Sequence, residues 1–181
     1  LIQIVTDIVA EADNPNQIVT ATGGVLTFDG LDNMLHQVKS KDGQVDFIMM
    51  NEREIRTLRS LKRGLGGTHG DQVTVNGIVM EAYAGIPIYR NDWIPTGLAD
   101  GADTGSATDE SVVFAGNFDD GSNTVGISGL TSVDNMGIHV QNVGASETKD
   151  EDIYRVKFYS SFAVFNELGI AMLEDVGFEG A

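Results

Sequence analysis

Two amphipathic helical patterns that enclose a short, wholly apolar run constrain the fold of this chain more than any other feature. Within residues 28–43, four apolar side chains recur at i, i+3, i+4 and i+7, the spacing of one helix face: Leu31, Met34, Leu35 and Val38. The run "DFIMM" at 46–50 is too short for a helix and is typical of a strand covered on both faces. A second helix is predicted over 52–64. The first third of the chain therefore predicts a helix–strand–helix unit.

The residues at the helix ends support these boundaries. Asp29 is the predicted N-cap of the first helix, and Gly43 is placed to end it. Asn51 is the predicted N-cap of the second helix, with Glu54 at the capping-box position three residues later. The inward face of the second helix is predicted to consist of Ile55, Leu58 and Leu61.

After the second helix the apolar period changes from 3.6 to 2. Asn76 and Gly77 separate two β-rich runs, and this pair is a strong signal for a type I′ hairpin turn. Pro87 has no N–H to donate, which confines it to a sheet edge or a strand start, and we expect its strand to border the sheet. Further strands are predicted in "SVVFAGNF", "TVGIS", "MGIHVQNV", "IYRVKFYSSFAVFN" and "GIAMLEDV". A few helices followed by many strands predict an α+β fold.

The composition limits the class of protein. The chain has 181 residues, 41% of them hydrophobic, which suits one domain or two small subdomains with a buried core. It contains no cysteine, so a disulfide scaffold and a thiolate metal site are excluded. No apolar run reaches the length of a membrane span, and the start lacks the features of a signal peptide. We expect a soluble protein that binds no membrane.

Acidic residues dominate the middle of the chain. The formal net charge is −16, and no Lys or Arg occurs between Arg90 and Lys149. Such a chain repels phosphate groups, which argues against sequence-specific binding of DNA or RNA. The simplest interpretation of the acidic stretch is solubility through self-repulsion.

No motif predicts catalysis or a cofactor. The glycine-rich segment 63–71 follows a helix instead of opening one and lacks the Lys-Ser/Thr of a P-loop, so a loop is the better interpretation. The three histidines are dispersed and have no metal-site spacing. Segment 117–123 offers oxygen ligands for calcium but lacks the alternating acids of an EF-hand loop, which favours a plain turn. We expect a protein that is not an enzyme and holds no metal or cofactor.

The order of these segments resembles the C-terminal portion of the major capsid proteins of tailed bacteriophages, a shell fold shared with encapsulins. Three phrases carry the resemblance within residues 25–176: an Asn that ends a buried strand before a Leu-rich helix, a Gly-x-Pro step before a polar corner, and Gly-Asn-Phe after an apolar strand. The resemblance implies an axial domain, a mixed or antiparallel sheet flanked by helices, over 25–148. It implies closing strands of the peripheral region over 149–181 and an entering segment over 1–24.

The resemblance also implies a function. The expected role is that of a self-assembling subunit of a phage or prophage capsid, in pentamers and hexamers of a virion assembled in the bacterial cytoplasm, with scaffold, maturation protease and portal as further partners. The arm, extended loop and spine helix of the family belong upstream of Leu1, so we expect a piece of a longer polypeptide. The 181 residues alone should then stay monomeric or form small oligomers, while the longer protein forms shells.

Two other functions remain open. One is an encapsulin-type compartment, which shares the fold; the presence of an encapsulated enzyme would distinguish it from a viral capsid. A calcium-dependent surface-binding module would use the acidic stretch 92–134, and a calcium titration would test it.

Subunit contacts are expected at three places in the sequence: the basic helix, the loop behind it and the polar corner after Pro87. Arg56, Arg59 and Arg63 share one side of the second helix and could meet acids of a neighbouring copy. Solvation of the helix is the simpler role for these arginines. The candidate contact residues are Arg53, Arg56, Arg59, Arg63, Gly66, Gly67, His69, Pro87, Arg90, Asp92 and Trp93.

Overall fold

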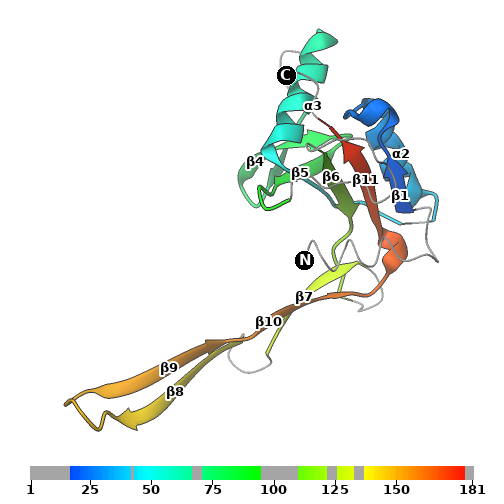
Figure 1. Cartoon of the computed structure of the whole chain (residues 1–181). Helices are drawn as coiled ribbons and strands as arrows, with labels where there is room; N and C mark the ends of the chain where they lie inside the picture. Colours follow the sequence, from blue (N-terminus) through cyan, green and yellow to red (C-terminus); the bar gives the residue numbers. More distant parts are fainter. Residues whose placement is uncertain are drawn as a thin grey trace, which may run out of the picture.

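The protein is built on a mixed seven-stranded sheet, from which a narrow β ribbon projects (Figure 1). The computed structural model describes residues 17–41, 43–66, 71–94, 110–121, 126–132 and 137–177. In spatial order the strands of the sheet are β1 (Ile18–Thr20), β11 (Ile170–Val176), β6 (Ser111–Gly116), β2 (Phe47–Met50), β5 (Ile86–Arg90), β4 (Ile78–Tyr83) and β3 (Gln72–Val75).

Two helices cover one face of this sheet, as the apolar periodicity predicts. Helix α2 spans Phe28–Lys39 and α3 spans Glu52–Gly64. All four apolar residues predicted for the inner face of α2 are buried in one core, together with Ile55 and Leu58 of α3. Leu61 of α3 is only partly buried. The helix–strand–helix unit is therefore confirmed, with β2 as its strand.

The central strands are covered on both faces. In β6 all six residues are buried. Val113 and Ala115 belong to the core under the helices, while Val112 and Phe114 belong to a second core on the opposite face. Because neighbouring residues of a strand point to opposite faces, a strand enclosed in this way is continuously apolar. The same reasoning predicted β2, where three of the four residues are buried.

The helix caps agree with the sequence in one case and differ in the other. The side chain of Asn51 accepts hydrogen bonds from the backbone N–H groups of Arg53 and Glu54, at 2.7 and 3.2 Å, so it is the N-cap of α3. Helix α2 is capped by Thr27, whose hydroxyl accepts from Gly30 at 3.1 Å, and the prediction of Asp29 was wrong. Asp29 lies in the first turn, where the helix dipole favours an acid.

The hairpin prediction is confirmed, but the prediction of an edge strand is wrong. Asn76 and Gly77 have φ values of 50° and 81° and join β3 to β4. Pro87 lies in β5, between β2 and β4 and not at the border of the sheet. The proline is tolerated because it is the second residue of the strand, and the ladder between β5 and β2 begins only at the next residue, Ile88.

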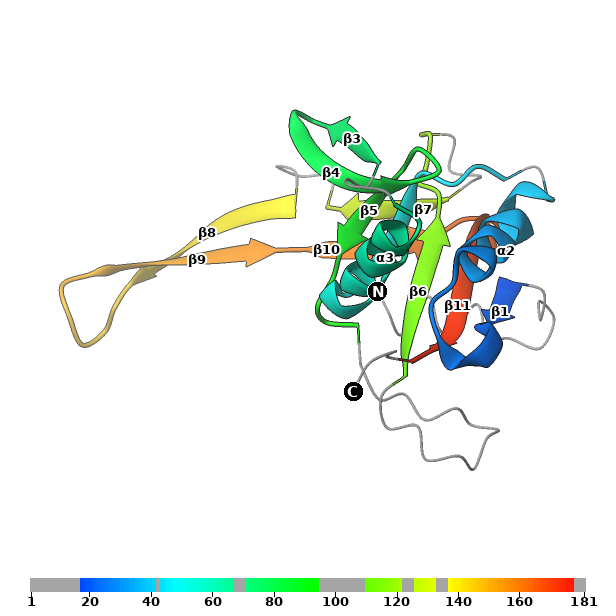
Figure 2. The same cartoon turned by 90° about the horizontal axis from the view of Figure 1, so that it is seen from above.

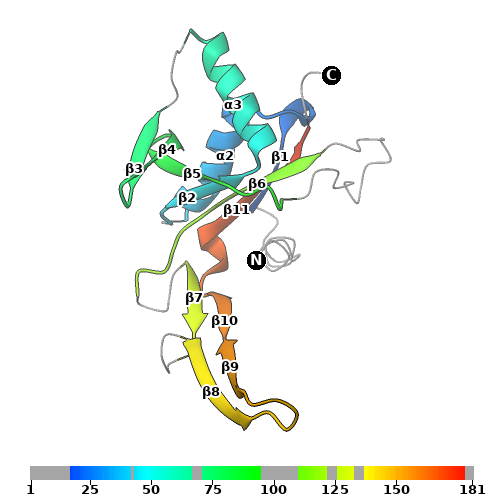
Figure 3. The same ribbon diagram turned by 90° about the vertical axis from the view of Figure 1, so that its left-hand side faces the viewer.

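The projecting part is a two-stranded antiparallel ribbon made of two successive ladders. Strand β7 (Ile127–Thr131) pairs with β10 (Ser160–Val164) at its base, and β8 (Ile138–Ala145) pairs with β9 (Asp152–Phe158) beyond it. Figures 2 and 3 show the ribbon leading away from the sheet and its helices. At the base, Ile127 belongs to the second core and Val164 packs against it.

The strand pairing crosses the expected segment boundaries. The border between 25–148 and 149–181 lies in the turn that joins β8 to β9, so the ribbon unites the two segments. Strand β11 of the closing segment lies inside the main sheet, between β1 and β6. In the entering segment, β1 pairs in parallel with β11 at the sheet edge. Sequence order alone did not indicate that the chain leaves the sheet after β6 and returns to it in β11.

Candidate subunit-contact surfaces

The chain turns a tightly bonded corner at the end of β5. The backbone N–H of Asn91 donates to the carbonyl of Met50 at 2.9 Å, and the Asn91 side chain accepts from the N–H of Trp93 at 3.0 Å. Ile94, next in the chain, is 2% exposed and anchors the corner in the second core. Trp93, by contrast, is 89% exposed. The corner therefore holds the backbone of Trp93 and presents its ring to solvent.

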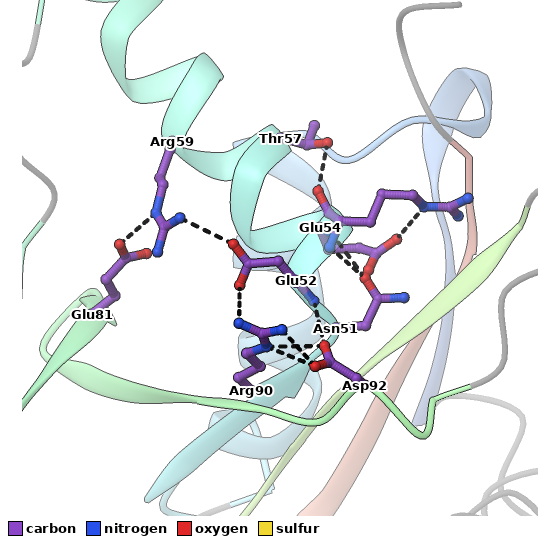
Figure 4. A network of polar contacts seen from close by, with 9 residues as sticks. Asn51, Glu52, Glu54, Thr57, Arg59, Glu81, Arg90 and Asp92 are labelled. Carbon is purple, nitrogen blue, oxygen red and sulfur yellow. Dashed lines mark hydrogen bonds and ion pairs between the residues drawn. The ribbon is translucent and has the colours of Figure 1, made fainter.

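Charged side chains connect this corner to α3 and β4 (Figure 4). Arg90 contacts Asp92 at 2.6 Å and Glu52 at 3.1 Å. Arg59 contacts the other oxygen of Glu52 at 3.3 Å and Glu81 of β4 at 2.5 Å. The network joins three elements that lie far apart in sequence. Because these groups face water, it contributes more to the shape of the corner than to stability.

The network also changes the acidity of its members. The hydrogen bond from Arg90 lowers the pKa of Asp92, and the backbone N–H of Glu52 adds a donor to the same carboxylate at 3.3 Å. The hydrogen bond to Glu81 raises the pKa of Arg59. Both effects favour the ionised forms, so the corner stays charged through the neutral range.

One carboxylate is buried beside this network. Glu54 is 2% exposed, and burial raises its pKa against the opposing contact with Arg53, whose Nε lies 3.2 Å from Oε1. The other oxygen, Oε2, has no hydrogen-bond partner among the described residues. Its place in the first turn of α3 allows the helix dipole to offset part of the cost of burial.

The second half of α3 borders an open hollow of about 500 Å³, which we call the α3 groove. Its lining combines apolar and cationic side chains: Phe28, Arg56, Thr57, Ser60, Leu61, Arg63, Gly64 and Leu65. Leu65, at the end of the helix, is 79% exposed. Gly66 follows with φ 85° and donates to the carbonyl of Arg63 at 2.9 Å, which ends the helix.

The structure separates the predicted basic surface into two parts. Arg59 is paired within the subunit by Glu52 and Glu81, whereas Arg56 and Arg63 line the α3 groove. Arg53 contacts Glu54 of the same helix. Gly67 and His69 lie outside the described residues.

The ribbon presents an apolar face whose residues are not among the predicted contacts. Facing residues of an antiparallel pair share one side, so the pairs Ile138–Phe158 and Val140–Val156 lie on the same face of the ribbon. The pair Gln141–Arg155 lies on the other face. The exposed apolar residues of the first face are Ile138, Val140, Tyr154, Val156 and Phe158. Their alternation was visible in the sequence, but not the fact that no element in the described part of the chain covers them.

Some other kinds of site find no support in the described part of the chain. It contains no group of three or more His, Asp or Glu residues placed to hold a metal ion. Asp119 and Asp120, two of the calcium ligands considered, are described, while Asn123 is not. Within the same residues, no helix combines the length and apolar character that a membrane span requires.

Comparison with solved structures identifies the fold. The cryo-EM structure of the holo-SrpI encapsulin complex from Synechococcus elongatus PCC 7942 matches with a TM-score of 0.70 at 20% identity, over 99% of this chain and 63% of the SrpI chain. A phage-related protein from Bordetella bronchiseptica RB50 matches with a TM-score of 0.41 at 10% identity, over 97% of this chain and 62% of the other. The expected α+β shell fold is confirmed by the SrpI match. No curated protein sequence matches the chain.

The family assignment follows from the sequence itself. The family model for "Type 2A encapsulin shell protein SrpI-like" matches residues 7–179, nearly the whole chain. This match favours the encapsulin alternative over the viral capsid that the resemblance first suggested. The scaffold, maturation protease and portal belong to the capsid interpretation and lose their basis with it. The chain belongs to the SrpI-like family of type 2A encapsulin shell proteins.

Proposed function

We propose that this protein is a structural subunit of an encapsulin-type compartment, a closed protein shell assembled from many copies inside the cell. The proposed role is architectural and not catalytic. The expected virion would enclose a genome, whereas the proposed compartment encloses protein. The family match over residues 7–179 supports this assignment, while the chain spans 63% of the length of the SrpI subunit.

The observation that carries the proposal is the uncovered ribbon. A two-stranded hairpin is at best marginally stable in water unless its apolar face packs against another layer. Here Val156 and Phe158 are 66% and 61% exposed, on a ladder that extends away from both cores. A contiguous apolar surface of this kind marks a protein–protein contact. A subunit that completes its core only on assembly is suited to a shell.

The test is to purify the protein from the cell that makes it and to examine it by light scattering and negative-stain microscopy. Closed, hollow particles are expected. Mass spectrometry of the particles should find a second protein inside. After nuclease treatment of the intact particles, no protected nucleic acid should remain. Protected genomic DNA would instead restore the viral interpretation. A protein that stays monomeric at all concentrations would contradict the shell function.

A further inference from the structure

The chain displays its only tryptophan on a surface built to hold it in place. Trp93 is 89% exposed, yet the corner beneath it is fixed by Asn91 and by the buried Ile94. The bidentate contact between Arg90 and Asp92 adds to this rigidity. Tryptophan is enriched among the residues that dominate binding energies, and a residue held in its bound position loses little entropy on binding. The exposed ring therefore has the properties of an interface anchor.

The α3 groove has the chemistry to receive an aromatic ring. Phe28, Leu61 and Leu65 provide apolar surface, and the groove volume of about 500 Å³ is in the range of hollows that hold compact ligands. Arg56 and Arg63 lie on its exposed rim. A guanidinium placed over an indole ring is attracted by its π face, more strongly than over a smaller aromatic ring. The groove thus offers both an apolar floor and cations suited to tryptophan.

The corner contacts the start of α3, whereas the groove lies along its second half. Glu52, which binds Arg90 of the corner, precedes Leu61 of the groove by nine positions. Nine residues correspond to about 14 Å along an α-helix. Because Arg56 and Arg63 of the groove leave the helix within about 40° of Glu52, the two surfaces are separated along α3 and not around it.

Two different surfaces on one subunit are what a ring of identical copies requires. In a cyclic ring each contact is head to tail, so a feature on one side of a subunit meets another feature on the far side of its neighbour. We propose that Trp93 of each subunit inserts into the α3 groove of the next copy, where it packs on Leu61 and Leu65 and beneath Arg56 and Arg63. The proposal rests on the shell function proposed above and identifies one contact that fixes the ring.

Photochemical crosslinking tests the contact directly. Trp93 is replaced by a benzophenone-bearing phenylalanine, which keeps an aromatic side chain at the corner, and assembled particles are irradiated. The expected product is a ladder of linked subunits extending beyond the dimer, because head-to-tail contacts repeat around a ring. Peptide mapping should place the link within 56–65 of a second copy. The same probe at Leu168, an exposed site on a different element, should not link to α3.

A double-mutant cycle gives an independent measurement. Trp93→Ala removes the ring, and Ser60→Trp fills the groove; both sites are exposed, so urea melts should show unchanged subunit stability. Each change should raise the subunit concentration needed for assembly about tenfold or more. In the double variant the second change should add nothing, since both act on one contact. Ser40→Trp, which adds the same bulk at the exposed serine that follows α2, is the control.

The outcomes separate this contact from the shell function. Particles that form normally, with a link at another peptide or a ladder that stops at the dimer, would overturn the Trp93 contact and leave the shell function intact. Additive effects in the double variant would also overturn it. If the unmodified protein forms no particles, the shell function fails, and this contact fails with it.

Discussion

At the scale of single residues, the buried carboxylate of Glu54 is the least expected feature of α3. It lies in the first turn, where an acid is favoured by the helix dipole, but its side chain is enclosed between the helix and the sheet. A buried polar atom without a partner costs free energy, and Oε2 is such an atom among the described residues. Glu54 therefore lowers the stability of the subunit at neutral pH.

Glu54→Gln should change how stability depends on pH. Because burial raises the pKa of Glu54 in the folded state, the folded protein binds the proton more tightly than the unfolded chain. The contribution of this group to stability therefore falls as pH rises from the ordinary value of 4.5 to the raised pKa. The stability of Glu54→Gln relative to the native protein should increase over this range and level off above it.

Urea melts at a series of pH values would measure this difference. Glu52→Gln is the matched control, since Glu52 lies on the same turn but is part of the more exposed network with Arg59 and Arg90. A difference between Glu54→Gln and native protein that stays constant with pH would show that the carboxylate titrates as in the unfolded chain.

At the scale of elements, the two sides of α3 serve different purposes. Leu58 is 1% exposed in the core against the sheet, while Arg56 lies on the outer surface. Leu58→Ala should cost about 2 to 5 kcal/mol of unfolding free energy through lost burial and the cavity it leaves. Arg56→Ala should change it by less than about 0.5 kcal/mol. Urea melts that gave the two changes equal costs would contradict this assignment of faces.

The β3–β4 hairpin depends on one backbone conformation. Gly77 has φ 81°, in the left-handed region that side chains disfavour, although nothing lies within 4 Å of an added Cβ. Gly77→Ala should therefore cost about 1 to 2 kcal/mol through backbone strain alone. Gly129 of β7 has equally open surroundings without a positive φ, so Gly129→Ala should cost much less. Equal melting curves for the two variants would exclude strain as the cause.

The elements differ in how far the sequence predicts them, for physical reasons. Both helices and the Asn76–Gly77 turn follow from local rules, because a periodic face or a positive φ restricts few residues at a time. Pro87 lies inside the sheet because β2 pairs with the free edge of β5, and this pairing depends on contacts between residues that are distant in sequence. The burial of Glu54 likewise depends on Ser111 of β6, which follows it by about sixty residues.

At the scale of the whole molecule, the same limit applies to the candidate contacts. Arg90, Asp92 and Trp93 lie in one corner because they are neighbours in the chain, and Arg90 contacts Asp92 there. The sequence could not predict that Arg59 is paired within the subunit or that Arg56 and Arg63 border a groove. Those facts depend on how α3 packs against β4 and the start of α2. A net charge of −16 adds repulsion between copies, so the proposed assembly must draw on apolar contacts.

In the proposed shell the ribbon supplies such a contact, and a charge placed on its apolar face should prevent assembly. Val156→Glu would bury a carboxylate in the interface of the shell, which is costly unless the charge is paired. Gln141→Glu adds the same charge on the opposite face of the same ladder and is the matched control. Because both positions are exposed in the subunit, both variants should unfold at nearly the native urea concentration. Light scattering and microscopy should then find particles for Gln141→Glu and none for Val156→Glu. Shells of Val156→Glu in native yield would mean that the apolar face stays in solvent, and the ribbon would lose its assigned part in assembly.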